Sequence, residues 1–150
     1  MTSEIRKAVK IRRAKQLDAE RIAILSGQLG YPTTTKQMVV RLGRALRAKD
    51  GACFVATTKE DEVIGWVHVS VTPLLEVERR AEVNGLVVDE KARSRGSGAI
   101  LLEVAEEWAK KMKCSGMSVR SNVIRDRAHT FYLRQGYEHY KTQKAFRKTL

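Results

Sequence analysis

The segment best suited to chemistry reads LVVDEKARSRGSGA over residues 86–99. Backbone N–H groups at the start of a helix have no helical partner, and the aligned peptide dipoles add positive potential there. Gly96 and Gly98 allow an anion to approach the backbone, and Arg93 and Arg95 add positive charge. The segment therefore predicts a pyrophosphate-binding turn. It is neither a Walker A loop, since no Gly-Lys-Ser/Thr follows, nor the G-x-G-x-x-G dinucleotide fingerprint.

Two elements must hold this turn in place. Residues 82–88 end in the apolar run Leu86-Val87-Val88, which is typical of a strand buried on both faces. From Ser97 to Met112, apolar residues recur at helical spacing, which predicts an amphipathic helix. The turn should thus connect a buried strand to a helix N-terminus.

The rest of the chain predicts further elements of both kinds. We expect strands where β-branched residues alternate with polar ones, and helices where apolar residues follow Asp18 and Thr35, the expected N-caps. Glu60 and Asp61 would turn a hairpin. The expected strands are Ala8–Arg13, Ala52–Thr58, Val63–Val71, Met117–Asn122, Tyr137–Tyr140 and Thr142–Arg147, and the other helices run from Asp18 to Leu29, from Thr35 to Leu46 and from Asp126 to Gln135. This order predicts one mixed α/β domain over residues 1–150.

A second motif lies about thirty residues after the turn, where residues 128–137 read AHTFYLRQGY. Together with the R-S-R-G-S-G turn and the strand before it, this resembles the GNAT superfamily of acyl-CoA-dependent N-acetyltransferases. The resemblance covers nearly the whole chain. It implies an α/β (α+β mixed) GNAT fold: a mostly antiparallel central sheet of about seven strands, splayed in the middle and flanked by about four helices.

The resemblance also implies acetyl-CoA as the acetyl donor. Backbone groups of 94–99 would hold its pyrophosphate, and those of 86–88 would pair with the pantetheine arm as an added strand would. Many members carry Asn where this chain has Arg125, and Asn122 lies three residues earlier, at the predicted strand end. Arg125 could contact a CoA phosphate instead, the alternative being a cap on the strand. The expected cofactor-binding residues are Leu86, Val87, Val88, Arg93, Ser94, Arg95, Gly96, Ser97, Gly98, Ala99, Asn122 and Arg125.

Two side chains are the expected catalytic residues. By resemblance, Tyr132 would protonate the departing CoA thiolate as a general acid, the alternative being a core aromatic. Glu82 would take the proton of the attacking amine, the alternative being a solvated charge on a strand edge. An N–H near Leu86 or Val87 would stabilise the oxyanion. The resemblance also places a β-bulge at Asn84-Gly85.

Several other side chains carry two interpretations. Glu76, Glu78 and Glu82 could attract a cationic amine, or the loop could be neutralised by its own arginines. Trp66 and His68 could line a substrate pocket, although packing against a helix is favoured. We do not expect His129 to act as a base.

The composition limits the possible functions. The 150 residues include 29 Lys or Arg and 17 Asp or Glu, for a net charge of +12. Recurrent apolar residues argue against disorder, and no stretch approaches the roughly 20 apolar residues of a membrane span. The N-terminus lacks the apolar core of a signal peptide, so we expect a cytoplasmic protein. The spacing of Cys53, Cys114 and the histidines predicts no metal site and two reduced thiols.

The expected function is acetyl transfer from acetyl-CoA to a primary amine, in a ternary complex, with a cationic small molecule as the acceptor. A protein or peptide amine is the runner-up. Nucleic-acid binding is the alternative that the basic charge suggests, but no nucleic-acid motif accompanies it. A CoA-binding protein without activity is a further alternative. A homodimer is plausible, and no membrane partner is expected.

Overall fold

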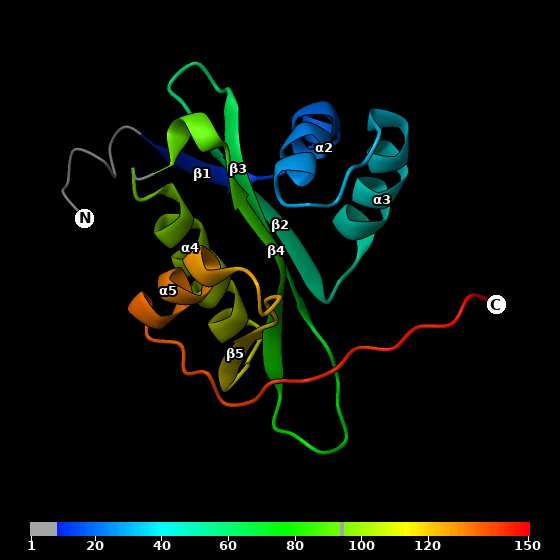
Figure 1. Cartoon of the computed structure of the whole chain (residues 1–150). Coiled ribbons are helices and arrows are strands. Elements are labelled where there is room, and N and C mark those ends of the chain that lie inside the picture. Colours follow the sequence, from blue (N-terminus) through cyan, green and yellow to red (C-terminus); the bar gives the residue numbers. More distant parts are fainter. Residues whose placement is uncertain (1–8, 94) are drawn as a thin grey trace. The chain divides into compact units, whose positions relative to one another are not determined.

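The computed structural model describes residues 9–93 and 95–150. These residues form two compact units, one ending at Val119 and one beginning at Arg120. Figure 1 shows the elements. In chain order they are β1 (Lys10–Arg13), η1 (Gln16–Asp18), α2 (Ala19–Gln28), α3 (Thr35–Arg47), β2 (Gly51–Thr57), β3 (Val63–Val71), β4 (Arg80–Val88), η2 (Glu90–Ala92), α4 (Ser97–Lys111), β5 (Gly116–Val119) and α5 (Asp126–Arg134).

A single sheet with the strand order β1-β2-β3-β4-β5 forms the centre of the first unit. Neighbouring strands are antiparallel from β1 to β4, whereas β4 and β5 are parallel. This mostly antiparallel sheet and the four α-helices confirm the predicted mixed α/β class.

The prediction of about seven strands was wrong, because the described residues contain five. Residues 137–140 and 142–147, predicted as a closing pair, form no strand. From residue 138 onward every side chain is exposed, Phe146 at 90%. The segment alternates as a strand would, but it carries mostly polar side chains. It therefore buries too little apolar surface to offset the entropy of ordering.

The helices of the first unit cover both faces of the sheet, and β3 shows how. A Cβ at Gly65 would lie 3.2 Å from Leu101 of α4, whereas the next residue, Trp66, belongs to the core under α2 and α3. Successive side chains of a strand point to opposite faces, so α4 lies on one face and α2 and α3 lie on the other. Strand β2, between β1 and β3, is buried over nearly its whole length.

Local sequence explains where two of the helices begin. Thr34 caps α3: its hydroxyl accepts a hydrogen bond from Gln37 N at 3.1 Å, and the Gln37 side chain accepts one from Thr34 N. The cap is therefore one residue before the predicted Thr35. Asp18 does stand at the N-cap of α2, as predicted, but its side chain makes no capping bond there.

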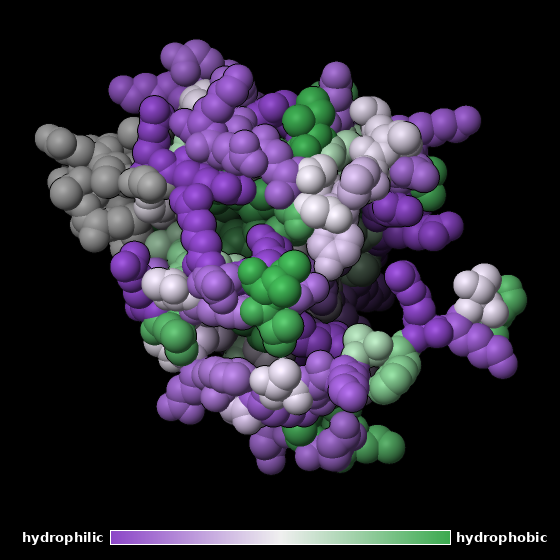
Figure 2. All heavy atoms as spheres, viewed as in Figure 1, coloured by the Kyte–Doolittle hydropathy of each residue, from purple (hydrophilic) through white to green (hydrophobic). Residues whose placement is uncertain are grey.

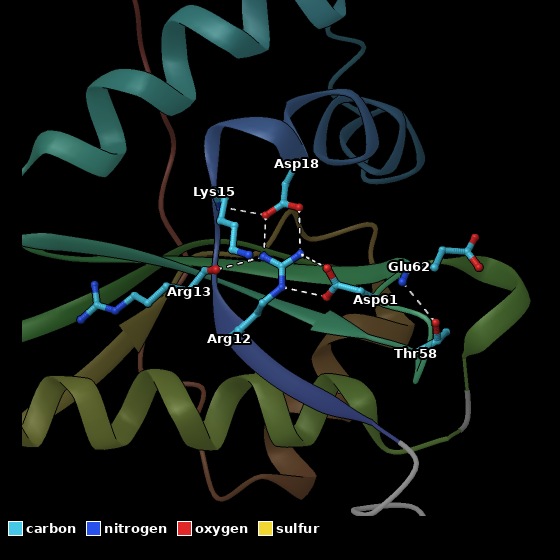
Figure 3. Close-up of polar contacts among 7 residues, drawn as sticks. All are labelled: Arg12, Arg13, Lys15, Asp18, Thr58, Asp61 and Glu62. Atoms are coloured by element: carbon cyan, nitrogen blue, oxygen red, sulfur yellow. Dashed lines mark hydrogen bonds and ion pairs between the residues drawn. The ribbon is translucent and has the colours of Figure 1, made fainter.

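The carboxylate of Asp18 instead forms the buried centre of a cluster with Arg12, shown in Figure 3. Arg12 donates to both oxygens of Asp18, at 2.8 and 3.0 Å, and through Nε to Asp61 at 2.9 Å. Burial opposes ionisation of Asp18, but the bonds from Arg12 and from Lys15 N outweigh it and lower the pKa of that carboxyl. The cluster joins β1, η1 and the β2–β3 turn.

Nothing in the described part of the chain is both helical and apolar over a length that would cross a membrane. Cys53 is buried and Cys114 half-buried, and both thiols are free. Within the described residues, no group of three or more Cys, His, Asp or Glu side chains is arranged to hold a metal ion.

Candidate functional site

The predicted pyrophosphate turn lies at the N-terminus of α4. Gly96 is the N-cap and adopts φ +79°, a left-handed conformation that favours glycine. The first helical hydrogen bond runs from Ile100 N to Gly96 O at 3.1 Å. The N–H groups of Ser97, Gly98 and Ala99 therefore precede the ladder of helical bonds. Such groups, with the helix dipole behind them, suit an anion.

Ser97 gives this turn an additional polar group. Its residue is 2% exposed, and its hydroxyl oxygen is buried with no hydrogen-bond partner among the described residues. A buried hydroxyl without a partner costs about 1–3 kcal/mol. A phosphate oxygen placed at the turn would accept its hydrogen, so the residues present fit a diphosphate ligand.

The segment that leads into the turn is anchored by α2, which sequence analysis did not foresee. Arg21 donates to Asp89 at 2.9 Å, and Gln28 donates to the same carboxylate at 3.4 Å. Gln28 also accepts a hydrogen bond from Glu90 N, at 3.0 Å. Burial opposes ionisation of Asp89, but hydrogen bonds from Lys91 N, Arg21 and Gln28 outweigh it and lower its pKa. Arg21 and Gln28 lie more than 60 residues before Asp89 and Glu90 in sequence, so no local pattern marks these contacts.

The two arginines of the turn lie differently. Arg93 is half-buried, and its Nε donates to Val88 O at 3.3 Å, so it also braces the end of β4. Arg95 is exposed. Ser94 and Ala8, at which a strand was predicted to begin, lie outside the described residues.

β5 is short and ends before β4 does. β4 pairs with β5 only from Arg80 to Val83, opposite Gly116 to Val119, the last residue of β5. Within the first unit, Leu86–Val88 therefore pair with β3 and have no strand partner on the β5 side. These residues lead to the α4 N-terminus. The predicted splay of the sheet stays a prediction.

The β-bulge predicted in β4 is confirmed. His68 pairs with Gly85 and Val69 with Val83, so Asn84 is the extra residue. Its amide donates to Ser70 Oγ at 2.8 Å. The bulge lies next to the last residue of β4 that pairs with β5. It therefore lies where the pairing between β4 and β5 ends.

Glu82 is half-buried on β4, opposite Ser70 of β3 and Ser118 of β5. By register, its side chain lies on the same sheet face as Ser70, next to the bulge. Glu76 and Glu78 lie on the exposed β3–β4 loop rather than on the strand that carries Glu82. No described ion pair joins this loop to its own arginines, and Arg79 Nε donates to Met112 O at 2.8 Å.

Trp66 packs in the core under α2, as the helix-packing interpretation predicted. Its ring lies across Gly85, where an added Cβ would come within 2.7 Å of it. His68 is half-buried on the same face, and burial lowers its pKa. Trp66 is thus a core residue on this face of the sheet. His68 lies on the same face, between the core and the polar residues around Ser70.

The second unit contains the predicted phenol. Tyr132 is half-buried on α5, and its ring meets those of Phe131 and Tyr137 edge-on, with centroids 5.1 and 5.8 Å away. Burial raises the pKa of Tyr132 to about 12, although the charge of Arg125 acts in the opposite direction. The phenol therefore keeps its proton at neutral pH and can donate it.

Asn122 and Arg125 belong to the turn before α5. Asn122 is exposed and accepts a hydrogen bond from Ile124 N at 3.2 Å, and β5 ends before it, at Val119 rather than at the predicted Asn122. Arg125 stands at the N-cap of α5. The His129 ring hydrogen-bonds to Asn122 O at 2.8 Å, which explains that side chain without a catalytic role.

Comparison with known proteins gives a family match and a set of similar structures. The profile of the Acetyltransferase (GNAT) family matches residues 12–137. A transcriptional regulator from Bacillus halodurans C-125 is 24% identical, with a TM-score of 0.84 over 93% of this chain and 99% of that chain. An aminoglycoside antibiotic 6'-N-acetyltransferase from Acinetobacter baumannii is 16% identical, with a TM-score of 0.84 over 95% and 99%.

An aminoglycoside N-acetyltransferase in complex with CoA is 18% identical, with a TM-score of 0.84 over 95% of each chain. At these identities the similarity establishes a shared fold. No curated protein sequence matches the chain.

Proposed function

Because the chain belongs to the acetyltransferase (GNAT) family, we propose that it transfers an acetyl group from acetyl-CoA to a primary amine of a cationic small molecule. One observation carries the proposal: Leu86–Val88 have no strand partner on the β5 side within the first unit, and they lead to a turn whose N–H groups lie outside the helical ladder. A strand end of this kind near an anion-binding turn suits a ligand that has an amide-bearing arm and a diphosphate. Acetyl-CoA is such a ligand.

In this proposal, the N–H groups of 94–99 and the hydroxyl of Ser97 bind the diphosphate, with Arg93 and Arg95 adding charge. The peptide groups of 86–88 pair with the pantetheine arm as a further strand. By the family resemblance, Asn122 or Arg125 would also contact the cofactor. The buried, unpartnered hydroxyl of Ser97 supports this assignment, because a bound phosphate would satisfy it.

The proposed reaction is direct attack. The amine nitrogen attacks the thioester carbonyl carbon, the C–N bond forms, and the C–S bond breaks. The departing thiolate takes a proton from the phenol of Tyr132, and the proton lost by the amine passes to Glu82, directly or through water. An N–H near Leu86 or Val87 stabilises the transient oxyanion. With a pKa of about 12, the phenol of Tyr132 is protonated at neutral pH, which a general acid requires.

A cationic acceptor is favoured by the half-buried carboxylate of Glu82, which lies opposite Ser70 of β3 and Ser118 of β5. Such a carboxylate attracts an ammonium ion and can then accept its proton. Two proteins of this fold are aminoglycoside acetyltransferases, which agrees with this substrate class. A peptide or protein amine is the second candidate.

An acceptor screen tests the proposal. The protein is incubated with acetyl-CoA and one amine at a time, and free thiol is followed over polyamines, aminoglycosides, amino acids and peptides. We expect thiol release that depends on a cationic small amine and saturates with it. Release with peptides alone would move the assignment to the runner-up. Absence of both turnover and calorimetric heat with CoA would overturn the proposal.

A further inference from the structure

The outer surface of α3 is basic and partly apolar. Lys36, Gln37, Val40, Arg41 and Arg44 line a shallow pocket on this helix, and we call it the basic α3 pocket. Val40 is 52% exposed, so the pocket presents a hydrophobic centre to solvent. The helix contains no acidic residue. Within the described residues, none of the three cations forms an ion pair. A hydrophobic patch rimmed by unpaired charges is typical of an interaction surface.

The loop between β3 and β4 has the opposite charge and a similar mixture of side chains. We call residues 72–79 the acidic loop. Leu75 is completely exposed, and Leu74 and Val77 are 40% and 37% exposed. Glu76 and Glu78 stand beside them and have no ion-pair partner among the described residues. The loop thus holds a protruding leucine next to two free carboxylates.

These two surfaces lie apart within the first unit. Figure 1 shows the acidic loop projecting from the far end of the β3–β4 hairpin, away from α3. A chain cannot place this loop on its own α3. Figure 2 shows that hydrophobic side chains reach the molecular surface in separate patches within a largely hydrophilic face. Within the first unit, therefore, neither of the two complementary surfaces covers the other.

We propose that two copies of the chain associate by placing the acidic loop of each in the basic α3 pocket of the other. Leu75 would enter the pocket against Val40. Glu76 and Glu78 would pair with the cations at its rim. A two-fold axis makes this contact twice, which closes the assembly as a dimer. The proposal does not depend on which amine is acetylated.

The energetics favour a two-fold arrangement. Stable interfaces bury roughly 1,200–2,000 Å² in total, more than one loop in one shallow pocket provides, so the contact must be made twice. The net charge of +12 on each chain opposes association. At about 0.15 M salt, screening acts beyond about 8 Å, so whole-molecule repulsion is damped while ion pairs in contact persist. The leucines supply the affinity and the charges set the partner.

Nucleic acid is the other partner that the basic α3 pocket suggests. Its phosphates would satisfy the cations, but they would leave Val40 exposed and would repel the acidic loop. A second copy uses both the charge and the apolar centre of each surface. The dimer is therefore the partner that the observations favour.

Light scattering after gel filtration tests the proposal, with the full chain at tens of micromolar and 0.15 M salt. We expect a mass twice the 17.0 kDa of one chain. Leu75→Ser should weaken the dimer by about 100-fold, because two buried leucines are lost. The control Leu17→Ser, at a side chain that is 92% exposed on η1, should leave the mass unchanged.

Charge reversal gives the sharper test. The pair Arg41→Glu and Arg44→Glu should yield monomers, and so should the pair Glu76→Arg and Glu78→Arg, since each puts like charges in contact. Mixing the two proteins should restore a dimer with one chain of each kind, because both kinds of surface then find a complementary partner. A matched pair away from both surfaces, Lys59→Glu and Lys113→Glu, should stay dimeric.

Monomeric wild-type protein, or a mixture that stays monomeric, would overturn the proposal. So would a monomer that binds a DNA duplex through α3 and loses that binding in the Arg41→Glu, Arg44→Glu protein. Circular dichroism and CoA calorimetry on each variant separate loss of association from loss of fold. A variant that is folded, binds CoA and is monomeric supports the assignment.

Discussion

Arg21 and Asp89, which are 68 positions apart in sequence, form an ion pair of 2.9 Å that joins α2 to the end of β4. The same guanidinium donates twice to Val63 O, at 3.0 and 2.9 Å. It therefore fixes the start of the α4 turn relative to β3. The shape of the turn depends on a helix that does not belong to it.

Replacing Arg21 tests that dependence. We expect Arg21→Gln to raise the Kd for CoA by about tenfold, because a hydrogen bond to a charged group contributes about 1.5–3 kcal/mol and the turn loses its anchor. Calorimetry with CoA measures the effect. Glu20→Gln, an exposed change on the same helix, is the control and should bind as wild type does. Equal affinity for all three proteins would contradict the anchoring role.

Ser97 should show opposite effects on stability and on binding. In Ser97→Ala the buried, unpartnered oxygen is gone, so the free enzyme should be unchanged or up to about 1 kcal/mol more stable. CoA affinity should fall by about tenfold, because the phosphate loses a donor. Urea unfolding and calorimetry give the two values. A variant that is less stable yet binds CoA normally would remove Ser97 from the site.

Tyr132→Phe tests the general acid. We expect turnover to fall by about 100-fold or more while CoA binding is retained, since acid catalysis contributes about 10²–10⁴-fold. Tyr140→Phe, at an exposed tyrosine, is the matched control. Unchanged turnover in the Tyr132→Phe protein would leave Tyr132 as a packing residue.

The pH profile of the wild type gives a second measurement on the same phenol. With a pKa of about 12, Tyr132 remains protonated below that value and loses its proton only as the pH rises through it. We therefore expect no loss of kcat between about pH 8 and pH 10 from this group. An alkaline fall in kcat that disappears in Tyr132→Phe would contradict the raised pKa.

The Arg12–Asp18 pair should govern stability in acid. The pKa of Asp18 is below its ordinary value of 3.8. The contribution of Asp18 to the free energy of unfolding is therefore complete above pH 3.8 and is lost as the pH falls through the lowered pKa. We expect Asp18→Asn to cost about 3 kcal/mol at pH 7, because Arg12 loses its buried partner. The stability difference from wild type should shrink below about pH 4. Urea titrations at about pH 7 and pH 3 measure it.

Sequence patterns predicted the elements that carry their own hydrophobic periodicity. The strand Val63–Val71 and the start of the helix at Ser97 were placed correctly. Strand ends were less accurate: β5 stops at Val119 rather than at Asn122, because its pairing with β4 ends there. Such pairing depends on the neighbouring strand and leaves no local signal.

The candidate site was predictable where a motif is contiguous. The turn at Gly96 was placed by a short pattern and the bulge at Asn84 by the family resemblance, and the left-handed φ and the register shift confirm these two positions. Arg21 and Gln28 could not be found, because their partners are set by how α2 packs on the sheet. The roles of Glu82 and Tyr132 stay predictions.

The single extra residue in β4 has a consequence for insertion and deletion. Glu82 lies opposite Ser70, and Gly85 lies opposite His68. Ser70 and His68 are on the same face of β3, so the extra residue does not change which sheet face the later residues of β4 present. Deleting Asn84 would therefore leave every apolar side chain pointing where it does now. It would remove the local irregularity of β4 beside the last pair that this strand makes with β5. A chain shortened by this one residue should therefore fold with an intact interior and differ only in the course of β4 past the end of β5.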